Sequence, residues 1–495
     1  MNKNLSRFNK IASCVLTSIV IILSVLGTMN IDTVNAYAST ENTKNVKVSV
    51  NGGTLTNVRV IDISYDKNAY YSLRDLAALF NGTDKRFSLA VSGEEINIEL
   101  NTSYSLVDGY ENTPWNVEDN ESLKGHQLKS GNIYINDKAV NYYTLLVNID
   151  GVTDVFMTLN DLCMILNVKS EVSKDRTVKI DTSKDVDINP AKLERDGYFE
   201  SVNAVVIGDA TTGEIYYDYK KDEPFPIAST TKVISFTVLM DAIKNGEISE
   251  GDTVTISKNA ARLSKGEDRV IEFQEGKKTT VKELMYAMML PSSNESALAN
   301  AEHLCGSEEE FVKRMYELAS RLKLGTASFY NCHGLPYYIE GQVASKVHNR
   351  LSAGDMFKLV SYLLNTYPET TEITSLEKYA LKDFGGKQIK NTNPILKNMP
   401  EVTGLKTGTT NRAGCCFITS LRVTNNGSTH DLVVVMYGAE NGIERGRVSQ
   451  TLATYAKNVY LGKADKFSTE VTVEEEEAMP VTAEGIVSKV MNTTR

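Results

Sequence analysis

The chain has 495 residues and a formal net charge of −10; 41% of its residues are hydrophobic and 23% are charged. This length indicates more than one domain, and the composition is ordinary for a globular protein. The negative charge, with no basic stripe along the sequence, argues against nucleic acid as a partner.

Residues 1–38 have the pattern of an export signal. A basic start precedes a mostly apolar run at residues 11–27, and an Ala-x-Ala cleavage pattern follows at residues 36–38. The apolar run is also borderline in length for an uncleaved membrane anchor. We favour cleavage because of the Ala-x-Ala pattern. The sequence therefore predicts an exported protein that acts outside the cell, in the cell wall or at the outer face of the cytoplasmic membrane.

Residues 46–184 contain an internal duplication, with copies at about residues 46–100 and 132–184. Each copy predicts a turn-joined strand pair, then a short helix with a Ser/Thr-x-x-Asp start, then a closing strand pair. The helix starts at Ser72 in the first copy and at Thr158 in the second, 86 residues later. The sequence predicts a duplicated α+β module.

This module resembles the copper amine oxidase N-terminal-like domain, a stalk-like region that precedes secreted catalytic domains. Its one histidine, His126, and one cysteine, Cys163, are too few for a copper site, so we expect no metal there. Two interpretations stay open: the region is a spacer, or it binds the cell wall.

The first of three short motifs, Ser229-Thr230-Thr231-Lys232, places a serine and a lysine three residues apart. Residues 233–240 are almost wholly apolar and predict a buried helix, so both side chains should face one cavity. A serine hydroxyl needs a base to become a nucleophile. A buried lysine can be that base if burial and a second cation, Lys406, favour its neutral form. The motif predicts a serine nucleophile with a lysine base.

The second motif, Ser292-Ser293-Asn294, follows a predicted helix at residues 281–290 that Pro291 ends. Ser292 and Asn294 can both face the cleft from such a loop. There Ser292 would relay a proton, and Asn294 would orient Lys232 and the substrate. Helix capping by these residues is the alternative interpretation.

The third motif, Lys406-Thr407-Gly408, continues into Thr409 and precedes a predicted hairpin that turns at Asn426-Gly427. On an edge strand, Gly408 would let a substrate backbone approach and pair with the chain. A second Ser-x-x-Lys sequence, at residues 375–378, is expected by chance. The three motifs in this order predict an active-serine acyltransferase.

The chain resembles the serine D-alanyl-D-alanine carboxypeptidases, which are low-molecular-weight penicillin-binding proteins, over about residues 198–462. Besides the three motifs, the resemblance rests on the sequences at residues 331–336 and 404–410. It implies an α/β penicillin-binding/β-lactamase-like domain, in which an antiparallel sheet is flanked by helices and joined to a helical lobe. Residues 463–495 would form an acidic tail.

The same resemblance implies how the site works. Ser229 would be acylated with Lys232 as its base, and Ser292 and Asn294 would assist. The backbone N–H groups of Ser229 and Thr409 would form the oxyanion hole. Substrate would be bound by the third motif: Lys406, Thr407, Gly408 and Thr409. The implied reaction trims the terminal D-alanine from peptidoglycan stem pentapeptides without metal or cofactor, and β-lactams would inhibit it.

The chain departs from the family pattern at two places. The arginine that usually precedes the third motif is replaced by Asn391-Thr392-Asn393. Lys390 or Lys397 can substitute with weaker carboxylate binding, because lysine lacks the bidentate fork of arginine. For Arg445 and Arg447 we expect a surface role. The usual proline before the His-Gly pair is a cysteine, Cys332.

For the other histidines and cysteines that could act in catalysis or metal binding, we expect structural roles. His333 should order the loop over the site, because Lys232 already fills the role of base. His303 and Cys305 should pack in the core, since no second ligand pair lies near them. Outside the export signal the cysteines are odd in number, and we expect mostly buried free thiols: Cys163, Cys305, Cys332, Cys415 and Cys416.

Two rival functions remain. A serine β-lactamase needs a deacylating glutamate in a Glu-x-x-Leu-Asn loop, which residues 295–405 do not contain. A non-catalytic wall-binding protein would act through the duplicated region and carry a silent acyltransferase domain, which the three intact motifs argue against.

Overall fold

A computed structural model describes residues 36–37, 43–62, 69–105, 127–128, 132–149, 152–195, 198–199, 202–265, 270–338 and 346–467. The predicted export signal lies outside this part of the chain, apart from residues 36–37, and so does most of the predicted acidic tail. The chain divides into two compact units: residues 1–139 with 143–185, and residues 140–142 with 186–495. Within the described ranges, no helix combines the length and apolar character that a membrane span requires.

The first unit contains two similar copies, each with strands, one short helix and a closing strand pair; three strands precede the helix in the first copy and four in the second, where the sequence predicted one pair. Its first copy comprises β2 (Thr43–Val50), β3 (Thr56–Asp62), β4 (Ala69–Ser72), α2 (Leu73–Phe80), β5 (Phe87–Ser92) and β6 (Glu95–Leu100). Its second copy comprises β8 (Asn132–Ile135), β9 (Lys138–Val140), β10 (Leu145–Ile149), β11 (Val152–Thr158), α3 (Leu159–Leu166), β12 (Lys169–Val172) and β13 (Val178–Asp181). Two short strands, β1 (Ala36–Tyr37) and β7 (Gln127–Leu128), pair with each other.

The two copies exchange strands. The closing strand of the first copy, β6, pairs in parallel with the opening strand of the second, β8, and β13 pairs in parallel with β2. The turn contacts match: Asn136 N donates to Ile98 O at 3.0 Å, and Asn51 N donates to Ile180 O at 2.8 Å. Each helix begins after a cap whose hydroxyl accepts from the backbone N–H three residues on. Neither copy therefore completes its sheets alone.

A buried ion cluster also joins the two copies. Arg59 Nη2 lies 2.8 Å from Asp75 Oδ1 and 3.1 Å from Asp154 Oδ2, and all three side chains are almost wholly buried. Ser72 Oγ donates to Asp154 Oδ2 at 3.1 Å. Burial raises the pKa of Asp154 to about 6, against the lowering effect of Arg59. Only Asp154 in this set comes from the second copy.

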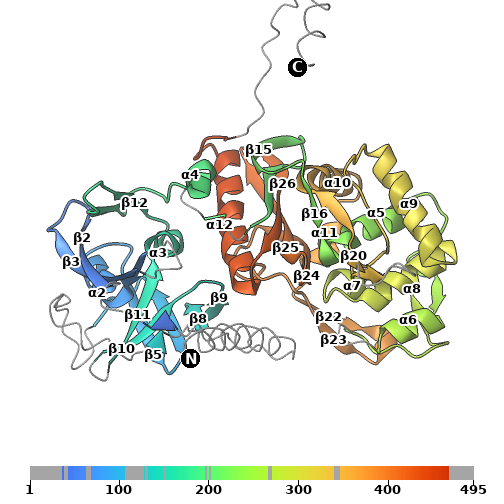
Figure 1. The fold of residues 1–495 in the computed structure, drawn as a ribbon, viewed down its shortest axis with the longest axis horizontal. Coiled ribbons are helices and arrows are strands. Elements are labelled where there is room, and N and C mark those ends of the chain that lie inside the picture. The colour runs from blue at the N-terminus through green and yellow to red at the C-terminus, as the bar shows by residue number, and fades with distance from the viewer. Residues whose placement is uncertain are drawn as a thin grey trace, which may run out of the picture. The chain divides into compact units, whose positions relative to one another are not determined.

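The second unit is built on a five-stranded sheet whose neighbouring strands are all antiparallel. The strand order is β15-β14-β26-β25-β24, formed by β14 (Ala204–Asp209), β15 (Glu214–Tyr219), β24 (Val402–Thr410), β25 (Gly414–Asn425) and β26 (Ser428–Ala439). Helices α10 (Ala353–Thr366) and α12 (Gly442–Tyr460) cover its two faces (Figure 1). On β26, Met436 faces Ser449 of α12, whereas Val435 belongs to the core cluster that includes α10.

A helical lobe stands beside the sheet and holds the buried helix α5 (Thr231–Lys244) at its centre. Around it are α6 (Lys258–Leu263), α7 (Val281–Met289), α8 (Asn294–Cys305) and α9 (Glu308–Arg321). The remaining elements are α4 (Pro190–Arg195), β16 (Pro224–Pro226), η4 (Ala228–Thr230), β17 (Thr253–Thr255), β18 (Lys278–Thr280), β19 (Tyr337–Tyr338), β20 (Lys346–Val347), β21 (Arg350–Ser352), α11 (Thr370–Thr374), β22 (Lys378–Leu381), η5 (Lys382–Phe384) and β23 (Lys387–Lys390).

The predicted fold class is confirmed: an antiparallel sheet with helices on both faces and a helical lobe. The apolar run at residues 233–240 lies inside α5, all of it buried. The predicted hairpin is formed by β25 and β26, and its turn residues Asn426 and Gly427 have φ of 50° and 81°, as a two-residue turn of this kind requires. The five described cysteines are free thiols, and four of them are buried.

Candidate active site

Ser229 lies in η4, the short turn that leads into α5. Ala228, directly before it, has φ of 46°, so the chain turns sharply at the serine. Ser229 is half-buried, whereas Lys232, one turn further along, has no exposed surface. The hydroxyl can therefore be reached from outside while the amine is kept from water.

The amine of Lys232 lies among four oxygens. Its Nζ is 3.0 Å from Ser229 Oγ, 2.6 Å from Asn294 Oδ1, 2.9 Å from His333 O and 3.4 Å from Ser292 Oγ. A neutral amine has two N–H donors and one lone pair. Asn294 Oδ1 and His333 O, which accept but cannot donate, take the two donors. The lone pair is then left for the proton of Ser229.

The second motif contributes differently at each residue. Ser293 caps α8, because its Oγ accepts from Ser296 N at 3.0 Å, so the capping alternative holds for this residue. Asn294 begins α8 and is buried. Ser292 has φ of 69°, a conformation that is uncommon for residues other than glycine. Its hydroxyl lies at the limit of hydrogen-bond distance from Lys232.

The third motif lies on β24, which is the last strand of the sheet as described. Lys406 is 2% exposed, and its Nζ donates to Thr407 O at 2.9 Å. Burial, and after it the charges of Lys232 and Arg445, hold the pKa of Lys406 well below its usual value. A buried cation is thus disfavoured here until an anion arrives.

Gly408 packs closely against the turn that carries Ser229. A Cβ at this position would lie 2.8 Å from Ser229 N and 2.9 Å from Thr230 N. The backbone of the turn that carries Ser229 therefore occupies the space beside Gly408. Gly408 lets the edge strand and the serine turn pack backbone to backbone.

Arg445 lies beside the third motif. Its Nη1 donates to Thr409 Oγ1 at 3.0 Å, and burial lowers its pKa. Its Nε has no hydrogen-bond partner among the described residues, and neither Arg445 nor Lys406 forms an ion pair within that part of the chain. Two cations thus flank Thr407 and Thr409. Arg445 itself is half-exposed, and its contact with the third motif was not predicted.

The other basic candidates lie elsewhere. Arg447, also predicted at the surface, is buried: its Nη2 is 2.7 Å from Glu444 Oε1, and its guanidinium lies 4.3 Å from the centre of the Tyr198 ring. Lys397 Nζ pairs with Glu377 at 3.3 Å in an exposed position, and Lys390 is exposed on β23. Neither lysine forms a hydrogen bond or an ion pair with the third motif among the described residues.

The residues that replace that arginine brace the third motif instead. Thr392 Oγ1 and Thr407 Oγ1 are 2.6 Å apart, and Asn393 Nδ2 donates to Gly404 O at 3.0 Å. Asn391 Nδ2 donates to the backbone carbonyl of Thr374 at 2.9 Å. Polar side chains thus hold β24 in place at the segment where the arginine usual in the family is absent.

His333 contacts the lysine base, Lys232, through its backbone carbonyl. Its carbonyl accepts from Lys232, while its ring Nδ1 accepts from Leu335 N at 3.1 Å. Burial and the charge of Lys232 lower the pKa of His333 to about 3, so the ring is neutral near pH 7. The ring orders its loop, as predicted. The role of the carbonyl was not predicted, because backbone groups leave no trace in a motif.

The second Ser-x-x-Lys sequence and the candidate metal ligand His303 remain to be placed in the structure. Ser375 ends α11 and Lys378 begins β22, so the second Ser-x-x-Lys sequence is not a helical pair. His303 Nε2 lies 4.0 Å from Asp252 Oδ2. In the ranges that the structure covers, no group of three or more His, Cys, Asp or Glu residues is arranged to hold a metal ion.

The site joins a half-exposed serine, two buried lysines and the guanidinium of Arg445 at one edge strand. A family model described as D-alanyl-D-alanine carboxypeptidase matches residues 194–441, which is half of the chain. The chain belongs to this family. The D-alanyl-D-alanine carboxypeptidase resemblance predicted from the three motifs is thereby confirmed, and all eight predicted site residues lie inside the matched range.

Two relatives in the D-alanyl-D-alanine carboxypeptidase family show how far the similarity extends. The chain is 31% identical over 263 residues to D-alanyl-D-alanine carboxypeptidase DacF of Bacillus subtilis, covering 53% of this chain and 63% of the relative. It is 29% identical over 258 residues to DacC of Escherichia coli, covering 51% and 60%. The chain thus spans less than two thirds of the length of these curated relatives.

A solved structure of similar sequence is that of a peptidoglycan synthesis regulatory factor, PBP3, from Streptococcus pneumoniae. The identity is 29%, the TM-score is 0.47, and the match covers 52% of this chain and 73% of that one.

Proposed function

We propose that this chain is a serine D-alanyl-D-alanine carboxypeptidase that removes the terminal D-alanine from peptidoglycan stem pentapeptides. The observation that carries the proposal is the pair formed by Ser229 and Lys232, with 3.0 Å between hydroxyl and amine and the amine fully buried. A buried amine that donates to Asn294 and His333 can accept the serine proton as the hydroxyl attacks.

The proposed reaction has two halves. Ser229 Oγ attacks the carbonyl of the penultimate D-alanine while Lys232 takes its proton, and the tetrahedral oxyanion faces the backbone N–H groups of Ser229 and Thr409. The proton then passes to the amine of the leaving D-alanine, with Ser292 close enough to share the transfer. Water cleaves the acyl-serine ester in the second half, and Lys232 acts again as base.

Recognition of the substrate carboxylate is assigned to the two cations at the third motif. Arg445 and Lys406 flank Thr407 and Thr409, and a terminal carboxylate would give both cations an anionic partner. We infer that Arg445, which comes from α12, replaces the arginine that is missing before the third motif. Its planar guanidinium offers the fork that Lys390 and Lys397 lack.

Intact-mass spectrometry of the full chain after mixing with benzylpenicillin tests the proposal. We expect a penicilloyl adduct on the wild-type chain that persists for minutes, no adduct on Ser229→Ala, and release of D-alanine from a peptide that ends in D-Ala-D-Ala. Rapid destruction of the drug without a lasting adduct would instead identify a serine β-lactamase. An intact drug and no adduct would mean a silent domain and would move the function to the first unit.

We also propose that the first unit binds a saccharide of the cell wall, the alternative being a spacer. A groove of about 390 Å³ lies over the 4-stranded sheet of β5, β6, β8 and β9. It is lined by Ser92, Glu95, Asn97, Tyr134 and Asp137, among others. An aromatic face beside amide and carboxylate groups suits a sugar ring, which has apolar C–H faces and a hydroxyl rim.

The duplication supplies a matched control for this groove. Asn97 lies opposite Tyr134 across β6 and β8. The equivalent pair at the other junction between the copies, across β13 and β2, is Lys179 opposite Ser49, which has no aromatic ring. The Ser229→Ala chain should be retained by purified peptidoglycan. Tyr134→Ala should release it, whereas Lys179→Ala should not. Retention unaffected by Tyr134→Ala would leave the spacer interpretation for this groove.

The location of the protein follows from these proposals. A substrate in the peptidoglycan layer requires export, for which residues 1–38 have the sequence pattern. Fractionation of cells that express the full chain, followed by detection of the penicilloyl adduct in each fraction, would test it. Adduct confined to the cytoplasm would contradict export.

A further inference from the structure

The loop that carries His333 is fixed on several sides. Ser235 Oγ, on α5, donates to Cys332 O at 2.6 Å, and Asn349 Nδ2 donates to Asn331 O at 2.9 Å. Gly334 lies so close to the serine turn that a Cβ there would be 1.9 Å from Ala228 O. The position of the His333 carbonyl, and with it one hydrogen bond of Lys232, depends on these contacts.

A further contact comes from Glu308, the first residue of α9. Its Oε1 accepts from Cys332 N at 3.0 Å and from Cys332 Sγ at 3.2 Å, and it lies 3.5 Å from His333 Nε2. A buried backbone N–H without a partner is costly, so this carboxylate satisfies a group that the loop cannot satisfy itself. A proline in place of Cys332 would have no N–H to offer.

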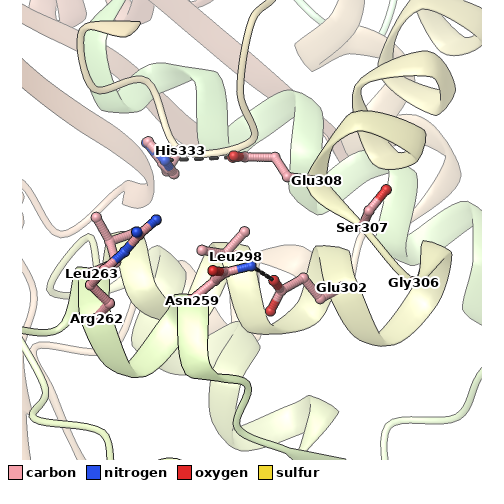
Figure 2. A pocket seen from close by; sticks show the side chains of 9 residues that line it. All are labelled: Asn259, Arg262, Leu263, Leu298, Glu302, Gly306, Ser307, Glu308 and His333. Atoms are coloured by element: carbon pink, nitrogen blue, oxygen red, sulfur yellow. Dashed lines mark hydrogen bonds and ion pairs between the residues drawn. The ribbon is translucent and has the colours of Figure 1, made fainter. Parts of the chain in front are cut away.

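Glu308 also faces a cavity. It lines a pocket of about 470 Å³ together with His333, Arg262, Leu298 and Glu302, and Figure 2 shows the Glu308 carboxylate reaching the imidazole of His333. His333 therefore separates two spaces: its ring lies on the pocket side, and its carbonyl accepts from Lys232. Burial raises the pKa of Glu308, and the hydrogen bonds from Cys332 oppose that rise.

We propose that Glu308 is a positioning residue for the serine–lysine pair, which it holds through the Cys332–His333 segment and the His333 carbonyl. The proposal rests on the proposed function, since it concerns the base of that reaction. Glu308 does not touch Ser229 or Lys232. Without it the Cys332 N–H loses its acceptor, the loop shifts, and Lys232 loses one of the two acceptors that orient its lone pair toward Ser229.

The contacts of Glu308 predict how much kcat should fall in each of two variants. Glu308→Gln keeps an acceptor oxygen, so kcat should stay within about threefold of the wild-type value. Glu308→Ala removes the acceptor, and kcat should fall by about tenfold, the effect of one lost hydrogen bond on the orientation of a catalytic group. KM should change by less than about twofold, because Arg445 and Lys406 are untouched.

Cys332 supplies an independent variant. Cys332→Ala keeps the N–H and should be close to wild type, whereas Cys332→Pro removes it and should resemble Glu308→Ala. If both changes break one hydrogen bond, the double variant Glu308→Ala/Cys332→Pro should lose no more kcat than either alone. Glu309→Ala, at the next and exposed position of α9, is the matched control and should leave kcat unchanged.

The experiment measures kcat and KM for D-alanine release, together with the rate of benzylpenicillin acylation, on the full chain and each variant after thermal unfolding shows a cooperative fold. A Glu308→Ala chain with wild-type kcat would overturn the proposal while the proposed function stands. Additive losses in the double variant would overturn it too. A wild-type chain that neither releases D-alanine nor reacts with penicillin would remove the proposed function itself, and this proposal with it.

Discussion

Arg445 and Thr409 are joined by a 3.0 Å hydrogen bond between α12 and the edge strand β24, although 36 residues separate them in the chain. Thr409 is exposed at the end of the third motif, and Lys406 lies buried three residues earlier. A helix that covers the sheet thus delivers a guanidinium to the same strand end as the motif lysine. A carboxylate bound at this strand end would lie near both basic groups.

Replacement of Arg445 by methionine should weaken recognition of substrates with a free terminal carboxylate. We expect kcat/KM for a D-Ala-D-Ala peptide to fall by about 10- to 100-fold, the range for a lost hydrogen bond between charged groups. The same peptide with a C-terminal amide should lose little. Lys397→Met, a change at an exposed lysine, is the control. Equal losses for the acid and the amide would contradict the assignment.

Replacement of Asn294 by alanine should slow acylation more than it lowers stability. Asn294 Oδ1 accepts from Lys232 at 2.6 Å, so its loss leaves the amine with fewer acceptors to orient it. We expect acylation by benzylpenicillin to slow by about 100-fold. Ser293→Ala should behave in the opposite way, with a loss of about 1 kcal/mol in the free energy of unfolding and little change in acylation rate. Stopped-flow acylation and urea unfolding separate the two effects.

Gly408→Ala should damage both the fold and the site. The added methyl group would lie 2.8 Å from Ser229 N, so strand and turn must separate. We expect a loss of about 1–3 kcal/mol in the free energy of unfolding, as for other overpacked sites, and strongly reduced acylation. Gly325→Ala is the control, because nothing lies within 4 Å of its Cβ. Wild-type acylation by Gly408→Ala would mean that the turn does not depend on this contact.

The stability of the protein should decline on the acid side in a way that depends on His333. The pKa of His333 is lowered to about 3 from a usual value of 6.5, so the unfolded chain binds the proton more readily than the folded one. The contribution of the neutral His333 ring to the free energy of unfolding is therefore complete above about pH 6.5. It is lost as pH falls toward 3, by at most about 1.4 kcal/mol per pH unit. His333→Asn should flatten the curve of unfolding free energy between pH 7 and 5. An unchanged slope would show that the ring is protonated without cost.

The ion cluster of the first unit should be essential to that unit alone. Arg59→Met leaves the buried carboxylates Asp75 and Asp154 without their shared cation, which should cost about 3–5 kcal/mol. Calorimetry of the full chain should show the transition of the first unit at a lower temperature. The rate of penicillin acylation should stay as in the wild type. A slower acylation would mean that the first unit supports the catalytic one.

Much of the site could be predicted because its chemistry is local in sequence. Ser229 and Lys232 occupy one helical turn, and the asparagine-glycine turn fixes the hairpin behind the third motif. The contacts of Arg445 and Glu308 could not be predicted, since they join residues far apart in the chain and no spacing in the sequence signals them. The contact of Gly408 with the serine turn could not be predicted, because a sequence cannot tell whether a glycine makes room for a substrate or for the protein's own backbone.

The exchange of strands between the two copies sets an order of events during synthesis. Among the strands of its sheet β2 is made first, but its parallel partner β13 ends at Asp181, so one edge of β2 stays uncovered until about 130 further residues have been made. An uncovered edge can pair with another chain. The first unit thus cannot finish folding from its first copy, and a ribosome that stalls within the second copy leaves a fragment prone to self-association.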